Sequence, residues 1–261
     1  MEVLAFIYGL VIGVSLGLTG GGGSIFAVPL LVYGLRISPR TAVTLSLAAV
    51  GLTAGFGAAL RIKERDIDVI PGFVFAFGGM LFAPLGAWVA HRVPDSALLI
   101  LFAMLMGVVG VKMWAGGSGH KPKTPQAVPA PNVISPVSFY ARLIGSGAGV
   151  GVLSGLFGIG GGFLVVPALL HVTKTTIHRA VATSLMVIFL VSISGFVAHL
   201  SNGGNFPMLA SALFIAGGFV GMLGGSAWRC RLSAEWLCKI FAVAMWIVGA
   251  MILFEEGVRG G

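Results

Sequence analysis

Two glycine-rich segments carry the clearest chemical signal in this sequence. The first covers residues 17–29 (GLTGGGGSIFAVP), and the second, 138 residues further on, covers residues 155–167 (GLFGIGGGFLVVP). Each lies inside an apolar stretch and is followed by a second apolar run, so each breaks a helix. The N-terminus of the helix after such a break offers unpaired N–H groups and the positive end of the helix dipole, which together bind anions.

The glycines would let an anion approach the backbone, because no side chains stand in the way. The candidate ligands are therefore the N–H groups of the two clusters: Gly20, Gly21, Gly22, Gly23 and Ser24, and Gly158, Gly160, Gly161 and Gly162. The competing interpretation is close helix packing, for which membrane helices also use small residues. Duplication of the cluster, with a proline in the same place after each copy, favours the functional interpretation.

Hydroxyl side chains early in the segment after each break are a second set of candidates. Ser46 and Ser184 are 138 residues apart, and Thr183 precedes the second of them. Such hydroxyls can donate to the oxygens of an anion, although they also commonly bond to the backbone of their own helix.

Other chemistries find little support in the sequence. No lysine follows either glycine cluster, which argues against a nucleotide-binding P-loop. All carboxylates lie in loops or at segment ends, so a carboxylate proton relay is not expected. We interpret four histidines as interfacial residues, namely His91, His171, His178 and His199. No nucleophile–base pair or metal-ligand cluster lies within a segment, and neither an enzyme nor a cofactor is predicted.

The composition indicates an all-α polytopic membrane protein. Hydrophobic residues make up 57% of the 261 residues and charged residues 9%, whereas soluble proteins carry about 25% charged residues. Several apolar stretches have the length of about 20 residues that spans a bilayer as a helix. They do not alternate as barrel strands do. The net charge of +8 comes from basic residues near segment ends, which indicates membrane topology rather than a nucleic-acid partner.

The chain divides into two homologous four-segment halves, each opening with a glycine-broken helix. The two apolar runs on either side of a glycine cluster count as one segment. The N-terminal transmembrane repeat covers 1–114, a Pro/Gly-rich linker covers 115–137, and the C-terminal transmembrane repeat covers 138–261. Beyond the glycines, residues 42–47 (AVTLSL) match residues 180–185 (AVATSL). The expected apolar segments are 3–18, 24–35, 41–60, 69–90, 96–114, 138–156, 162–172, 180–200, 206–228 and 235–254.

The basic residues test how the halves are oriented. If each glycine-broken segment crosses the membrane once, the 16 lysines and arginines divide evenly between the two sides. If each is re-entrant, the halves are inverted repeats and the division becomes 12 to 4, as the positive-inside rule favours. We therefore expect an external N-terminus and a cytoplasmic linker. An extra crossing in each broken pair would give the same division, so this alternative stays open.

The paired glycine motifs, each followed by a proline and then by a hydroxyl-containing element, resemble the sulfite exporter TauE/SafE family, also called the toluene-sulfonate uptake permease family. The resemblance covers nearly the whole chain outside the linker. It implies a multi-pass carrier in the bacterial inner membrane for sulfite, sulfoacetate, thiosulfate or related sulfonates. The family's glycine motif matches residues 20–24 and 158–162, and its Thr-Ser element matches Thr183 and Ser184. In the first half, Thr44-Leu45-Ser46 displaces the threonine from that pattern.

The predicted function is secondary transport of a small sulfur-containing organic anion, with the site at the paired half-helix N-termini. Export is the expected direction, because a membrane potential that is negative inside favours loss of an anion by about 2.3 kcal/mol per 100 mV. Two alternatives remain, a passive anion channel and a non-transporting membrane scaffold. Expected partners are the anion and membrane lipid, and a homodimer is left open.

Overall fold

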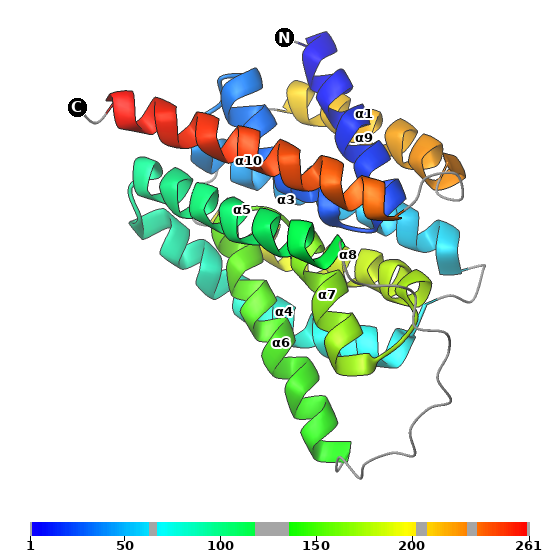
Figure 1. Cartoon of the computed structure of the whole chain (residues 1–261). Helices are drawn as coiled ribbons and strands as arrows, with labels where there is room; N and C mark the ends of the chain where they lie inside the picture. Colours follow the sequence, from blue (N-terminus) through cyan, green and yellow to red (C-terminus); the bar gives the residue numbers. More distant parts are fainter. Residues whose placement is uncertain (1, 63–66, 118–135, 202–207, 229–233, 260–261) are drawn as a thin grey trace.

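The computed structural model describes residues 2–62, 67–117, 136–201, 208–228 and 234–259. All regular structure in these residues is helical (Figure 1). Among these residues, five helices are long and apolar enough to cross a membrane. The central part of the linker, 118–135, lies outside the described residues.

The helices begin and end close to the expected boundaries. In chain order they are α1 (Glu2–Thr19), α3 (Pro39–Ile62), α4 (Val69–Arg92), α5 (Asp95–Gly117), α6 (Pro136–Phe157), α7 (Gly162–Thr173), α8 (Ile177–Ser201), α9 (Met208–Trp228) and α10 (Ala234–Arg259). The expected run 24–35 is helical but irregular. It combines a 3₁₀ segment η1 (Gly22–Phe26), one α-helical turn α2 (Ala27–Pro29) and a π-helical segment η2 (Leu30–Gly34).

Both glycine-broken segments are hairpins. Gly23 packs against Ser15 of α1, and Gly34, eleven residues further on, packs against the ring of Tyr8. The segment after the first break therefore returns along α1. In the second half, Gly161 packs against Val150 and Ser154 of α6, and α7 leads back from the break. Figure 1 shows α1 entering from one end of the molecule and α6 from the other.

Glycine contacts fix the directions of the long helices. Gly9 and Gly13 of α1 face Phe214 and Gly218 of α9, so these two helices run parallel. Other contacts of this kind show that α4 runs parallel to α6 and α8. They also show that α3 runs parallel to α9 and antiparallel to α8. Helices α1, α3 and α9 therefore run opposite to α4, α6 and α8. The two hairpins, which begin with α1 and α6, therefore enter from opposite faces.

We call these faces the N-terminal face, where α1, α3 and α9 begin, and the linker face, where they end. Contacts between the halves recur at nearly the same sequence offset. Gly9 lies against the carbonyl oxygen of Phe214, and Gly147 lies against that of Phe75. The helix pairs α1–α9 and α4–α6 can approach so closely because glycine brings the two backbones together.

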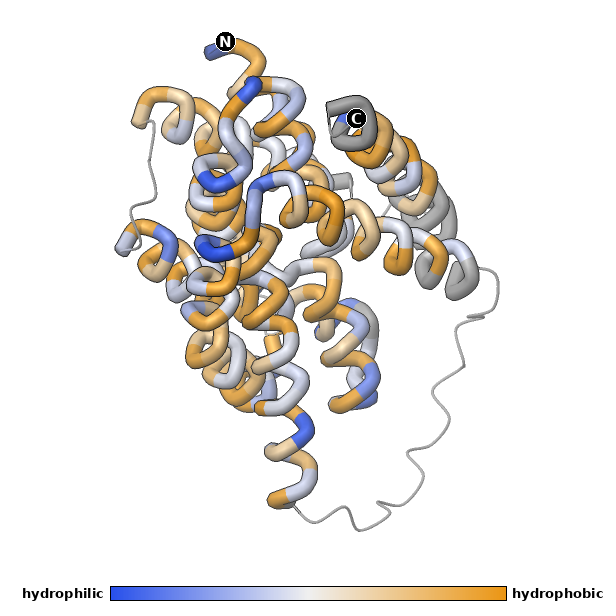
Figure 2. The backbone as a smooth tube through the Cα atoms, turned by 90° about the vertical axis from the view of Figure 1, so that its left-hand side faces the viewer, coloured by the Kyte–Doolittle hydropathy of each residue, from blue (hydrophilic) through white to orange (hydrophobic). Residues whose placement is uncertain are grey.

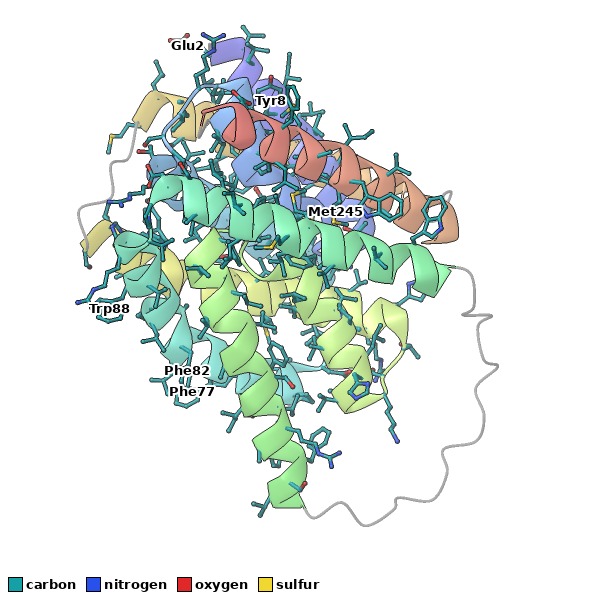
Figure 3. The ribbon with its side chains drawn as sticks, turned by 60° about the vertical axis from the view of Figure 1, so that its left-hand side comes forward. Glu2, Tyr8, Phe77, Phe82, Trp88 and Met245 are labelled. Carbon is teal, nitrogen blue, oxygen red and sulfur yellow. The ribbon has the colours of Figure 1, made fainter. Side chains whose placement is uncertain are left out.

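The outer surface is apolar. Figure 2 shows hydrophobic residues along most of the length of the helices. On α4, large exposed side chains recur every three or four residues: Phe73, Phe77, Leu81, Leu85 and Trp88. Figure 3 shows Phe77, Phe82 and Trp88 pointing away from the helix bundle. A stripe of this kind on a surface helix suits contact with lipid.

Candidate functional site

The two glycine clusters meet in the interior. A side chain on Gly21 would overlap the carbonyl oxygen of Gly162, and one on Gly162 would lie 2.6 Å from the carbonyl oxygen of Gly21. Eight of the nine predicted ligand residues in the clusters are buried, and Gly22 is half-buried. The two helix breaks therefore lie together.

Each cluster is fastened to the other half by a matching set of contacts. Ser46 Oγ donates to the carbonyl oxygen of Gly158 at 2.6 Å, and Ser184 Oγ donates to that of Gly20 at 2.8 Å. Gly20 has φ 74° and Gly158 has φ 70°, a left-handed conformation that glycine adopts without strain. Two of the three hydroxyls predicted as ligands, those of Ser46 and Ser184, therefore bind backbone carbonyls across the two clusters.

The first cluster is largely satisfied by its own neighbours. The Thr19 hydroxyl accepts a hydrogen bond from the N–H of Gly22 at 2.9 Å. Ser24 Oγ donates to the carbonyl oxygen of Gly21 at 2.8 Å. Thr19 thus caps the first break, which leaves fewer N–H groups there for a ligand.

The second cluster lacks this cap, because Phe157 occupies the position equivalent to Thr19. Gly160 and Gly161 have φ values of 65° and 70°. Among the described residues, no protein acceptor is found for the N–H groups of Gly160, Gly161 and Gly162. The backbone donors expected at a helix break are therefore open at this cluster.

Two serines that the sequence analysis missed lie beside these open donors. Ser154 and Ser192 are fully buried, and within the described part of the chain neither hydroxyl has a hydrogen-bond partner. A Cβ on Gly160 would lie 2.7 Å from Ser192 Oγ, and a Cβ on Gly161 would lie 3.6 Å from Ser154 Cβ. Their counterparts in the first half are Leu16 and Ala54, so comparison of the halves could not select them.

Thr183 is placed differently from its neighbour Ser184. Its hydroxyl accepts a hydrogen bond from the N–H of Asp68 at 2.9 Å. Asp68 in turn accepts from Thr175 at 2.9 Å and forms an ion pair with Arg179 at 3.5 Å. None of the hydrogen bonds found for Thr183 reaches a glycine cluster, so the structure groups it with the start of α4.

In the last turn of each helix that ends at a glycine cluster, a backbone carbonyl oxygen contacts a buried side-chain nitrogen. Arg61 donates to the carbonyl oxygen of Gly17 at 3.0 Å, and His199 Nε2 lies 2.6 Å from that of Gly155. His199 is 2% exposed. It lies in the last turn of α8, where an interfacial residue is expected, but its side chain is buried against Gly155 of α6 and His91 of α4.

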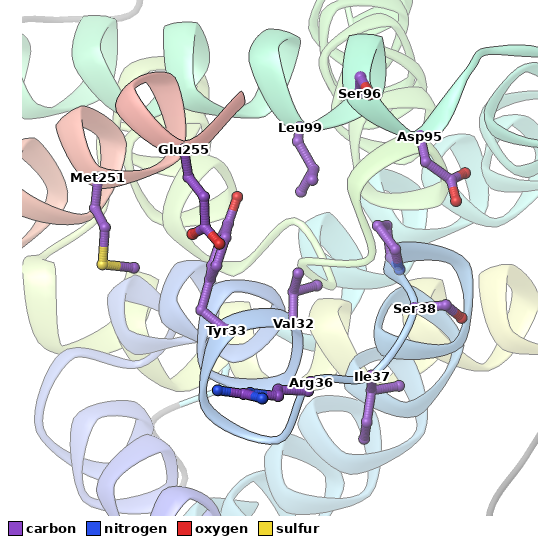
Figure 4. A pocket seen from close by; sticks show the side chains of 11 residues that line it. Val32, Tyr33, Arg36, Ile37, Ser38, Asp95, Ser96, Leu99, Met251 and Glu255 are labelled. Atoms are coloured by element: carbon purple, nitrogen blue, oxygen red, sulfur yellow. The ribbon is translucent and has the colours of Figure 1, made fainter. Parts of the chain in front are cut away.

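A pocket of about 870 Å³ opens elsewhere, at the N-terminal face (Figure 4). Its walls come from the end of the first hairpin, the start of α5 and the end of α10. Arg36, Asp95 and Glu255 are the charged residues that line it. None of the predicted ligand residues does so. No group of three potential metal ligands occurs among the residues that the structure describes.

The sequence matches a protein family and several probable membrane transporters. Residues 5–252 match the family model described as sulfite exporter TauE/SafE. A probable membrane transporter protein of Xylella fastidiosa is 32% identical over 95% of this chain and 93% of its own length. The probable membrane transporter protein YunE of Bacillus subtilis is 27% identical over 97% of both chains. No solved structure matches the chain. With its family match extending over nearly all of the helices described above, this multi-pass membrane protein belongs to the sulfite exporter TauE/SafE family of probable membrane transporters.

Proposed function

We propose that the protein is a secondary carrier of small sulfur-containing anions, such as sulfite or sulfoacetate, in the bacterial inner membrane. The anion would bind at the second glycine cluster, between the N–H groups of Gly160–162 and the hydroxyls of Ser154 and Ser192. The first cluster would support this site from the other half. This assignment narrows the paired site expected from the sequence to one of its two members.

The unpartnered hydroxyls carry the proposal. A buried hydroxyl without a partner costs about 1–3 kcal/mol, and two of them lie beside the uncapped glycine cluster. Oxygen atoms of a sulfonate or sulfite group would accept from these hydroxyls and from the glycine N–H groups. The positive end of the α7 dipole would favour the negative charge. A site of this kind needs no lysine or arginine.

Alternating access would follow from the arrangement of the two halves. We infer that they are inverted repeats, because equivalent hairpins enter from opposite faces and bind each other through equivalent residues. Rocking of one half against the other would expose the central clusters to each face in turn. Reciprocal bonds such as Ser46 to Gly158 would be the contacts that break and re-form.

Anion-dependent stabilisation of the purified protein tests the site. Sulfite, sulfoacetate, taurine, thiosulfate and acetate would be compared by thermal unfolding in detergent. A ligand at 100 times its Kd stabilises the native state by about 2.7 kcal/mol. Ser154→Ala and Ser192→Ala should remove most of this stabilisation, yet without ligand these variants should be at least as stable as the wild type, because each removes an unsatisfied hydroxyl.

The control is Ser201→Ala at the exposed end of α8, where the hydroxyl bonds within its own helix to the carbonyl oxygen of Val197. This variant should respond to anions as the wild type does. Equal anion stabilisation in Ser192→Ala and in the wild type would overturn the site assignment. Absence of stabilisation by every anion would favour the scaffold alternative. Flux in liposomes that neither saturates nor shows counterflow would favour a channel.

A further inference from the structure

We propose that His91 and His199 form a proton-binding site that couples anion movement to proton movement. This inference rests on the proposed transport function. The two imidazole rings lie 5.2 Å apart between centroids and are tilted by 43°. His91 ends α4 and His199 ends α8, both near the N-terminal face. His91 is half-buried, whereas His199 is enclosed.

The hydrogen bond to Gly155 fixes where a proton can be added. Because a carbonyl oxygen only accepts, Nε2 of His199 must carry the hydrogen that it shares with Gly155. Neutral His199 therefore holds a lone pair on Nδ1. Within the described chain this atom is buried and has no partner, and the same is true of His91 Nε2. A proton arriving at Nδ1 would convert His199 into a cation without disturbing its bond to Gly155.

The other half shows what such a cation does. Arg61, 138 residues before His199, donates to the carbonyl oxygen of Gly17 at the matching position of α1. A guanidinium keeps its charge at all physiological pH values, whereas an imidazole gains or loses its charge near neutrality. The last turn of α1 is thus held by a permanent cation, and that of α6 is held by a group that can switch.

This switch lies close to the second glycine cluster. Gly155 is three residues before Gly158, where the left-handed turn begins. A positive charge on His199 would favour an anion at the cluster, and an anion there would favour the proton. Linkage requires both effects to be equal. The anion and one proton would therefore bind and move together, with less net charge transferred per cycle than for the anion alone.

The charged groups on the elements around the pair do not supply its proton. Arg40 at the start of α3 forms an ion pair with Asp95 of α5 at 3.0 Å. Arg92, next to His91 on α4, lies over the ring of Trp88. On α6 and α7, Arg142 and His171 lie near the ends at the linker face. No carboxylate among the described residues forms an ion pair with either histidine, so water at the N-terminal face would be the proton source.

A liposome experiment separates coupling from transport. Purified protein would be reconstituted, and uptake of sulfoacetate would be measured with and without an imposed pH gradient. Its sulfonate and carboxylate stay ionised above about pH 6, so the probe carries no proton of its own. In the wild type, an acidic exterior should raise the initial rate of sulfoacetate uptake at least threefold. A pH-sensitive dye should report protons entering with the anion.

His199→Arg places a permanent cation where the other half has Arg61. Sulfoacetate flux in this variant should no longer respond to the pH gradient, and His91→Gln should weaken the response. Gradient-independent flux in the wild type would overturn the coupling while leaving carrier function intact. Complete absence of wild-type flux would instead count against the carrier itself, and against the coupling with it.

A second measurement does not depend on flux or on the folding of a variant. Nitrogen-15 NMR of histidine-labelled wild-type protein in detergent reports tautomers and protonation directly. His199 should carry its hydrogen on Nε2 at alkaline pH and gain a second hydrogen on Nδ1 as the pH falls. Sulfoacetate should move this transition to higher pH. A His199 signal that does not titrate between about pH 5 and 8 would overturn the proposal.

Discussion

At the scale of single residues, serine side chains at similar depths have different tasks. Ser46 and Ser184 donate to carbonyl oxygens of the opposite half. Ser154 and Ser192 have no partner in the described chain. The first pair therefore fastens the clusters, and the second pair is available to a ligand. Fastening and binding can be distinguished by stability measurements.

Replacing a fastening serine should destabilise the protein. Ser46→Ala leaves the carbonyl oxygen of Gly158 buried without its side-chain donor, a change that costs about 1–3 kcal/mol. Ser184→Ala should have the same effect through Gly20. Thermal or denaturant unfolding in detergent measures the change. Unaltered stability in both variants would mean that these bonds contribute nothing to the native state.

Alignment of the two halves predicted some of these residues and could not predict others. Ser46 and Ser184 are equivalent and were selected for that reason, as were the paired glycines. Ser154 and Ser192 face Leu16 and Ala54 in the alignment, so duplication concealed them. Thr183 is predicted because its hydroxyl lies early in the segment after the second break. A residue's position in a motif does not fix its rotamer, and the backbone N–H of Asp68 engages its hydroxyl.

At the scale of helices, the length of apolar runs predicted the segments well. All expected segments have helical counterparts, because a bilayer requires internally hydrogen-bonded backbone over a fixed length. The irregular return from the first break was not predicted. Pro29 lacks an N–H group for the regular helical ladder, but the corresponding Pro167 lies inside the regular helix α7. Local sequence alone therefore does not decide the helix type.

The partners of each helix depend on where glycine brings two backbones together. Gly13→Ala should destabilise the protein, because the added methyl group would overlap the carbonyl oxygen of Gly218 in α9. Separation of these helices should cost about 1–3 kcal/mol or more. Gly149→Ala in α6 is the matched control, since no heavy atom lies within 4 Å of its Cβ position. The thermal unfolding temperature of Gly13→Ala should be well below that of Gly149→Ala. Equal unfolding temperatures would show that close packing of α1 on α9 does not stabilise the protein.

At the scale of the whole molecule, the two faces differ in charge and in access. The sequence places 4 basic residues at the N-terminal face and 12 at the linker face when the hairpins are re-entrant. The contacts of Gly34 with Tyr8 support that arrangement. The open pocket lies at the less basic face, and Arg36 lines it. We infer that this pocket is the outer vestibule of the carrier and that Arg36 offsets the two carboxylates, Asp95 and Glu255, which would otherwise repel anions there.

Arg36 and Lys174 form a matched pair for testing this idea. They occupy equivalent positions at opposite faces, and both have left-handed backbone, with φ values of 54° and 52°. Asparagine tolerates this conformation well, so Arg36→Asn and Lys174→Asn remove charge with little backbone strain. Arg36→Asn should raise the KM for sulfoacetate presented at the N-terminal face by roughly two- to fivefold at low ionic strength.

The effect should vanish at high salt, because exposed charges beyond the Debye length of about 10 Å at 0.1 M are screened. Lys174→Asn should leave that KM unchanged. Initial rates of sulfoacetate transport, measured in membrane vesicles of both orientations, give the KM at each face separately. If Arg36→Asn instead lowered the maximal rate equally from both sides, the arginine would belong to the conformational cycle. Electrostatic attraction affects only transport from the face at which the anion arrives. An equal effect from both faces would therefore mean that η2, α5 and α10, which line the pocket, move relative to one another during transport.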